Sequence, residues 1–179
     1  MKATGIVRRI DDLGRVVIPK EIRRTMRIRE GDPLEIYTDS DGEVIFKKYS
    51  PIGELSSITS QYAEVLFRGT GLPVIVTDRD AVIACAGTSK KEVLDRRVSQ
   101  SLESLMEKRE NYVCSIDGER MKPVEGVDKN AAVAFPIIGG GDVSGALVML
   151  MHENGSCPTQ TETKLAQIAA SFLGKQMEE

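Results

Sequence analysis

The stretch "DDLGRVVIPKEIRRTMRI", residues 11–28, places a turn, a strand and a basic helix in quick succession. The β-branched run Val16–Ile18 favours a strand. Pro19 suits the first turn of a helix, because the N–H that proline lacks is one that a helix start leaves unpaired. So much positive charge in so short a segment indicates a surface that meets a polyanion.

The helix expected after Pro19 has a narrow apolar edge and a basic stripe. At about 100° per residue, Ile22 and Met26 lie about 40° apart around the helix axis. The cations lie on the opposite side. They are Lys20, Arg23, Arg24 and Arg27.

Short strands are expected on both sides of this helix. "TGIVRRI" (4–10) reads as a strand and Gly14 supplies the turn that follows it. "PLEIYT" (33–38) and "EVIFKK" (43–48) flank "DSDG", a hairpin signal. A β-β-α-β-β unit of about fifty residues buries only about 60% of its unfolded surface. We therefore expect two chains to interleave their hairpins in a homodimer.

The charge of the chain is unevenly distributed. Residues 1–29 hold nine Lys and Arg against three Asp and Glu, although the whole chain has a net charge of −3. Residues 30–50 and 51–179 are both acidic on balance. This asymmetry predicts a polyanion-binding module at the N-terminal end of an acidic body.

Double-stranded DNA is the polyanion that this segment fits best. A solvated basic face is the plainer interpretation, but residues 1–29 offer only Asp11, Asp12 and Glu21 as partners. Arginine bonds phosphates and guanine edges through two N–H groups at once. Residues 1–29 contain no aromatic side chain to stack on unpaired bases, which favours duplex over single-stranded DNA.

"GIVR", "DxLGRVVIPxExRR" (Asp11 to Arg24) and "LEIY" closely resemble the AbrB-type swapped-hairpin DNA-binding domain of bacterial transition-state regulators, over residues 1–50. The resemblance implies a β-barrel dimer with swapped hairpins. It also implies DNA contacts from Arg8, Arg15, Arg23 and Arg24, to which charge and spacing add Arg9 and Lys20. The same fold serves as the antitoxin half of toxin–antitoxin pairs, so the fold alone does not decide the role.

A second domain is expected over residues 56–179, after a linker at 51–55. Helix, hairpin, helices, strand, hairpin and helix follow in that order, which predicts an antiparallel sheet with helices to one side and an α+β chain overall. With "AAVAFPIIGGGDVSGALVML" (131–150), this order resembles a GAF-type sensor domain. The resemblance implies a pocket for a small-molecule or protein effector, but the "NKFDE" signature of cyclic-nucleotide binders is absent.

Two apolar seams at helical spacing, residues 55–65 and 165–172, have two interpretations. They pack on the sheet of their own chain, or they form a helix bundle with a partner chain. If both domains dimerise through different partners, the product is a homotetramer.

Catalytic and metal-binding chemistry is not indicated. Cys85, Cys114 and Cys157 are far apart in sequence and form no CxxC pair, and His152 is the single histidine. We therefore expect reduced, structural cysteines, no metal, no cofactor and no enzyme. "GGGD" (139–142) lacks the Lys-Ser/Thr of a phosphate-binding loop and reads as a hairpin turn.

The order of the two domains resembles the sporulation regulators of spore-forming bacilli. The resemblance implies a DNA-binding transcriptional regulator that activates some genes and represses others. No apolar run approaches the roughly 20 residues that span a bilayer, so we expect a cytoplasmic, nucleoid-associated protein without membrane contact. An antitoxin-type interaction protein is the alternative.

Overall fold

The computed structural model describes residues 4–178. The chain forms two compact units, and the first ends at Tyr49 while the second begins at Ser50. The smaller unit contains one helix and one hairpin. The larger unit contains a five-stranded sheet with helices. Among residues 4–178, no helix is long and apolar enough to cross a membrane.

The N-terminal unit contains α1 (Lys20–Met26), β1 (Leu34–Thr38) and β2 (Val44–Lys48). Helix α1 begins after Pro19, as the sequence predicted. It ends at Arg27, whose backbone is left-handed (φ 51°) and lets the N–H of Ile28 bond to the carbonyl of Arg23 at 2.7 Å. Strands β1 and β2 form an antiparallel hairpin in which Ile36 pairs with Phe46.

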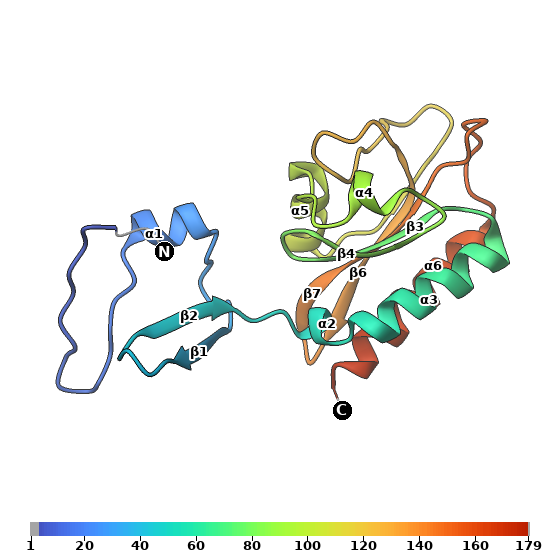
Figure 1. Ribbon diagram of the computed structural model, residues 1–179. Helices are drawn as coiled ribbons and strands as arrows, with labels where there is room; N and C mark the ends of the chain where they lie inside the picture. Colours follow the sequence, from blue (N-terminus) through green and yellow to red (C-terminus); the bar gives the residue numbers. More distant parts are fainter. Residues whose placement is uncertain (1–3, 179) are drawn as a thin grey trace. The chain divides into compact units, whose positions relative to one another are not determined.

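The strands expected at residues 4–10 and 15–18 are absent from the single chain. This segment runs as an open loop with a turn near Gly14 (Figure 1). Strand hydrogen bonds need a neighbouring strand, and residues 4–49 contain only the two-stranded β1–β2 sheet. The expected β-barrel is therefore not closed by one chain.

The C-terminal unit is built on one antiparallel sheet in the order β4-β3-β7-β6-β5. Its strands are β3 (Val74–Asp78), β4 (Val82–Ala86), β5 (Tyr112–Val113), β6 (Ala131–Gly139) and β7 (Asp142–Leu150). The central hairpin turns at Gly140 and Gly141, both with positive φ (59° and 88°). Two residues of this conformation make the tight turn predicted from "GGGD".

Helices cover both faces of this sheet, so the prediction of helices on one side only was wrong (Figure 1). One face carries α2 (Pro51–Glu54), α3 (Ser56–Thr70) and α6 (Gln160–Gln176). The other carries α4 (Lys90–Val93), α5 (Gln100–Lys108) and the loop at 114–130. The central strands are apolar at successive positions, and successive side chains point to opposite faces. Both faces therefore need a cover.

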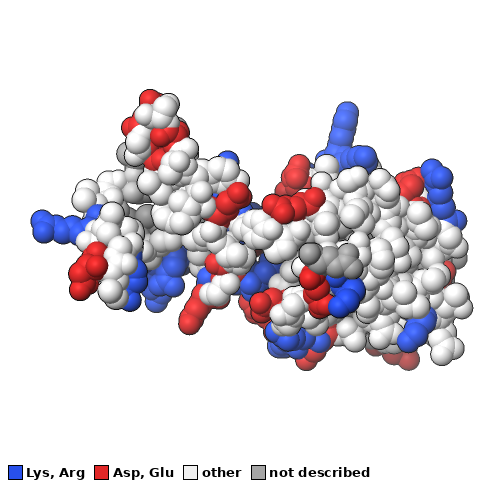
Figure 2. Space-filling model, turned by 90° about the horizontal axis from the view of Figure 1, so that it is seen from below, with Lys and Arg blue, Asp and Glu red and all other residues white. Residues whose placement is uncertain are grey.

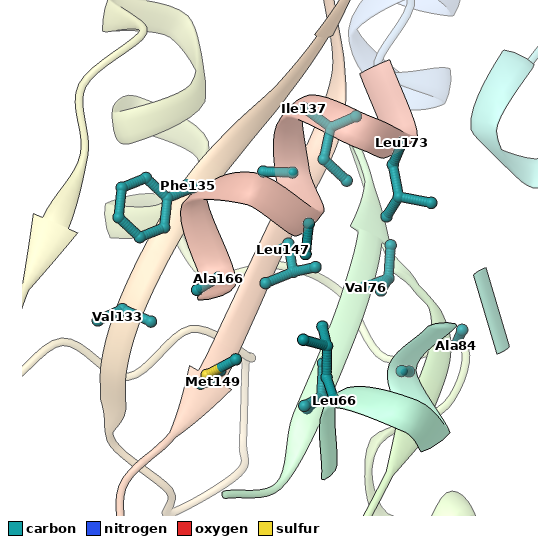
Figure 3. Packing of buried hydrophobic residues seen from close by; sticks show 14 of the residues in the cluster. Leu66, Val76, Ala84, Val133, Phe135, Ile137, Leu147, Met149, Ala166 and Leu173 are labelled. Carbon is teal, nitrogen blue, oxygen red and sulfur yellow. The ribbon is translucent and has the colours of Figure 1, made fainter. Parts of the chain in front are cut away.

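The face under α3 and α6 has a dense aliphatic core. Figure 3 shows Leu66 of α3 and Leu173 of α6 directed toward the sheet, where Val76, Leu147 and Met149 lie. Ile75 and Val148 lie on the opposite face, with Leu102 of α5. Each core side chain that is fully buried contributes about 1.5–3 kcal/mol of transfer free energy.

The segment expected as a linker, residues 51–55, is folded. Pro51–Glu54 form the helical turn α2, and the Ser50 hydroxyl accepts a hydrogen bond from the Gly53 N–H. Ile52 is 0% exposed and belongs to the core of the C-terminal unit. Burial of that side chain anchors the segment that follows the N-terminal unit.

Local hydrogen bonding explains where two helices begin and end. Thr159 caps α6, and its N–H donates in turn to the Glu162 carboxylate at 2.6 Å, the reciprocal capping box. Helix α4 stops at Val93. The carbonyl of Arg96 accepts from the N–H of Val82 at 2.9 Å, so pairing with β4 replaces helical bonds there.

Gly174 gives a direct test of the close packing between α6 and β6. A Cβ at this position would collide with the carbonyl oxygen of Ile138, and Gly174 is buried. We expect Gly174→Ala to lower the free energy of unfolding by about 1–3 kcal/mol, because the backbone of the sheet cannot move aside cheaply. Urea unfolding of the full chain, followed by far-UV circular dichroism, measures the change.

Gly69 is the matched control, since it is also helical and a Cβ there would meet nothing within 4 Å. Gly69→Ala should raise stability by about 0.5–1 kcal/mol through helix propensity. Equal effects of the two substitutions would contradict the packing argument.

Candidate nucleic-acid interface

Helix α1 presents three of the six predicted DNA-binding residues. Lys20, Arg23 and Arg24 are exposed, and they are neighbours on the helix surface because they are three and four positions apart. Within residues 4–178, no ion pair joins these three side chains to a carboxylate. Their charges are therefore available to an external anion.

Arg15 is held by the turn that precedes it. The Asp11 carboxylate accepts the backbone N–H of Arg15 and the guanidinium Nε, both at 2.8 Å, and the N–H of Leu13 at 3.0 Å. The backbone N–H of Arg15, then its guanidinium, hold the pKa of Asp11 below its ordinary value. The ion pair is exposed. It orients Arg15 at the surface and does not bury its charge.

Arg8 and Arg9 lie on the open segment before this turn, and both are exposed. Within residues 4–178, no hydrogen bond or ion pair joins them to α1. Figure 2 shows Lys and Arg side chains projecting from several points of the N-terminal unit in that view. A single chain thus carries its predicted DNA contacts on two segments, residues 8–15 and α1, without closing them into one patch.

Lys48 is engaged in contacts inside the unit. Lys48 Nζ donates to the carbonyl of Arg27, at the end of α1, at 2.9 Å and lies 3.6 Å from the Asp32 carboxylate. Asp32 in turn accepts the N–H of Arg29 at 2.8 Å. This cluster joins the end of α1 to β2.

Large apolar side chains of the N-terminal unit are exposed. Val7 is 87% exposed, and Ile10, Leu13 and Val17 are each at least two-thirds exposed. On one face of the hairpin, Ile36, Val44 and Phe46 are also uncovered. An exposed apolar surface of this kind indicates a missing partner.

The C-terminal unit has a second exposed apolar surface, on α3 and α6. Tyr62 and Phe172 stack with ring centroids 5.0 Å apart. We call the exposed residues around them the helix stripe. Its members are Ile58, Val65, Leu165, Ile168 and Phe172. The seams noted in the sequence thus pack on their own sheet and also leave apolar side chains uncovered.

Metal or cofactor chemistry gains no support from this geometry. Within residues 4–178, no group of three or more His, Cys, Asp or Glu side chains could hold a metal ion. A shallow pocket of about 380 Å³ lies beside α6, with Arg109, Gln167 and Ser171 in its lining. The sheet face under α5 is filled by apolar side chains.

Two protein families match the chain. The model described as "Stage V sporulation protein T C-terminal, transcription factor" matches residues 54–178. The model described as "Antidote-toxin recognition MazE, bacterial antitoxin" matches residues 7–53.

Relatives match one or both units. Stage V sporulation protein T of Bacillus subtilis (strain 168) is 50% identical over 181 residues, 100% of each chain. Transition state regulatory protein AbrB of the same organism is 65% identical over 51 residues, 28% of this chain and 52% of that protein. A solved segment of a methyl-accepting chemotaxis protein is 16% identical, covers 69% of this chain and 92% of its own, and has a TM-score of 0.53.

The predicted α+β fold class is confirmed, with an AbrB-type first domain and a second domain built on an antiparallel sheet with helices. The solved segment supports the fold alone. One family model covers residues 54–178 and one relative is 50% identical along the whole length, so this chain belongs to the stage V sporulation protein T family of transcription factors.

Proposed function

We propose that this transcription factor binds duplex DNA through a dimer of its N-terminal units, residues 1–50, and regulates sporulation genes from the nucleoid in the cytoplasm. Phosphates and guanine edges are contacted by the basic side chains of both subunits. These are Arg8, Arg9, Arg15, Lys20, Arg23 and Arg24.

The charge of the N-terminal unit carries this proposal. Lys20, Arg23 and Arg24 share one helix surface and have no internal carboxylate partner within residues 4–178. Nine basic residues among the first 29 would become eighteen in a dimer. Each phosphate neutralised releases condensed counterions and adds about −0.9 to the slope of log K against log salt.

Dimerisation is supported by the uncovered apolar surface. Val7, Leu13 and Val17 are exposed in one chain, and their segment has no strand beside it. A second copy of the same segment supplies both missing contributions, a hydrogen-bonding edge and an apolar cover. Interleaving would also bring the turn that carries Arg15 together with α1 of the other subunit.

The second unit, residues 56–179, is proposed to set the oligomeric state. Contact between two helix stripes would join dimers into a tetramer with a DNA-binding dimer at each end. A tetramer of this form can engage two sites or bend one segment, so specificity would arise partly from DNA deformability. An effector at this unit, and activation at some genes with repression at others, remain predictions.

Antitoxin activity is the second candidate, because an antitoxin family matches residues 7–53. A toxin-neutralising tail is expected to be disordered until it binds its toxin. Residues 50–178 instead form a compact unit with a buried core on each sheet face. The folded second unit favours the regulator.

Arginine removal tests DNA binding. We expect Arg15→Ala and Arg23→Ala each to weaken binding to duplex DNA by about 1–3 kcal/mol, since a phosphate or a base edge is left without its guanidinium partner in each subunit. The salt slope should become shallower by about 0.9 for each phosphate that is no longer neutralised. Gel shifts at several salt concentrations measure both quantities.

Arg96→Ala is the matched control, because it removes the same charge from an exposed position of the C-terminal unit. It should leave affinity unchanged. Thermal midpoints should stay close to the parent in all three variants, since the one ion pair that they break among residues 4–178, Arg15–Asp11, is exposed. Parent-like affinity in both Arg15→Ala and Arg23→Ala would refute this assignment.

Charge on the helix stripe tests the tetramer. Val65→Lys with Ile168→Lys places cations where two copies of α3 and α6 would meet, at side chains that are 65% and 52% exposed. We expect sedimentation velocity to change from tetramer to dimer. Ile116→Lys, at an 83% exposed apolar residue outside the stripe, should leave the tetramer intact. A tetramer in the double variant would exclude this interface.

A further inference from the structure

Three sulfur atoms and one guanidinium meet at an edge of the C-terminal unit. The Sγ atoms of Cys114 and Cys157 lie 3.3 Å apart, although the residues are 43 positions apart in the chain. Arg120 Nη1 lies 2.6 Å from Cys114 Sγ and 2.9 Å from Met151 Sδ. The cluster joins two segments: the loop at 114–130, which follows β5, and the connection from β7 to α6.

The two thiols are differently accessible. Cys114 is 5% exposed, and its backbone N–H is fixed to the carbonyl of Ala132 on β6 at 2.7 Å. Cys157 is partly exposed and lies in the connection between β7 and α6. Cys85, in β4, is a free cysteine in the core under α5. Within residues 4–178, its thiol forms no hydrogen bond with another cysteine.

We propose that Cys114 and Cys157 are a peroxide-responsive thiol pair that closes an intramolecular disulfide. A disulfide needs an S–S distance of about 2.0 Å, so the sulfurs must approach by about one more ångström. That shift falls within the partly exposed Cys157 segment. Neither DNA binding nor the family assignment requires this chemistry.

The reaction proceeds in two balanced steps with hydrogen peroxide as oxidant. The Cys157 thiolate attacks one peroxide oxygen, the O–O bond breaks, and Cys157 sulfenic acid and hydroxide form; hydroxide takes up the proton that the thiol released. The Cys114 sulfur then attacks the Cys157 sulfur, the S–O bond breaks, and water leaves with the Cys114 proton. Two thiols lose two electrons and one peroxide becomes two waters.

Burial and Arg120 explain the division of roles. Burial, then the neighbouring Cys157 thiol, raise the pKa of Cys114, so this sulfur is protonated and shielded until its partner is oxidised. Arg120 acts in the opposite sense and stabilises the Cys114 thiolate as its proton leaves. Arg120 is thus a positioning residue for the second step.

The disulfide would tie the start of α6 to the edge of the sheet. Cys157 lies two residues before Thr159, the residue that caps α6, and Cys114 directly follows β5. Oxidation therefore fixes a connection that also contains the pair of His152 and Glu162, 3.6 Å apart.

Thiol counting and peptide mapping on the full-length chain test the pair. The chain is treated with hydrogen peroxide, then with catalase, and is denatured in N-ethylmaleimide. Alkylated thiols should fall from three to one. Trypsin should release peptides 110–120 and 130–164 linked through Cys114 and Cys157, with the loss of two hydrogen atoms, and dithiothreitol should separate them. Cys85, in peptide 80–90, should remain alkylated.

Single substitutions separate the two steps. Cys85→Ser should still lose two thiols. Cys114→Ser should accumulate Cys157 sulfenic acid, trapped by dimedone, and Cys157→Ser should give no adduct on Cys114. Arg120→Gln should slow disulfide closure several-fold without slowing sulfenic acid formation. If Arg120 had only a structural role, the substitution would change the rates of both steps or of neither.

Retention of three alkylated thiols in the wild-type chain would overturn the proposal. So would a bond between two subunits on a non-reducing gel, a bond that includes Cys85, or direct overoxidation of Cys157 without the linked peptides. These results come from the unsubstituted chain and do not depend on the folding of any variant.

Discussion

A strand cannot form without a neighbour to accept and donate its backbone hydrogen bonds, and this constraint governs the N-terminal unit. Residues 4–18 have the β-branched pattern of two strands, but within residues 4–49 the only strand edges belong to the two-stranded β1–β2 hairpin. The same residues expose Val7 and Leu13 to water. Pairing with a second chain relieves both costs at once, so the DNA-binding surface and the quaternary structure depend on one event.

The C-terminal unit, in contrast, covers its hydrophobic core with helices of the same chain. Every strand of its sheet is antiparallel, and the two helical layers cover both faces. Close backbone contact at Gly174 and Ile138 brings α6 onto β6 without an intervening side chain. Rigid cover of this kind makes the unit a suitable platform for assembly, while the helix stripe supplies the apolar surface.

Local sequence signals predicted the elements that depend on local chemistry. Pro19 and the two glycines of the central turn acted as expected, because helix starts and tight turns involve a few adjacent residues. The resemblance to AbrB-type domains identified Arg15 and Arg23 as candidates, although their role in DNA contact remains a prediction. The second helical layer was missed because periodicity identifies an apolar side chain and not the face that it covers. Cys114 and Cys157 gave no signal, since only the completed sheet brings residues 43 positions apart into contact.

If two copies of residues 4–18 interleave as proposed, the arrangement also bears on the lifetime of the dimer in a differentiating cell. Threaded partners can separate only if both unfold, so mixing between older and newly translated copies would be slow. Each subunit would retain the partner beside which it was synthesised. Old dimers would then be lost through proteolysis and not through exchange of subunits with newly made chains. Genes controlled by such a protein would thus respond to the time at which the protein was synthesised as well as to its total concentration.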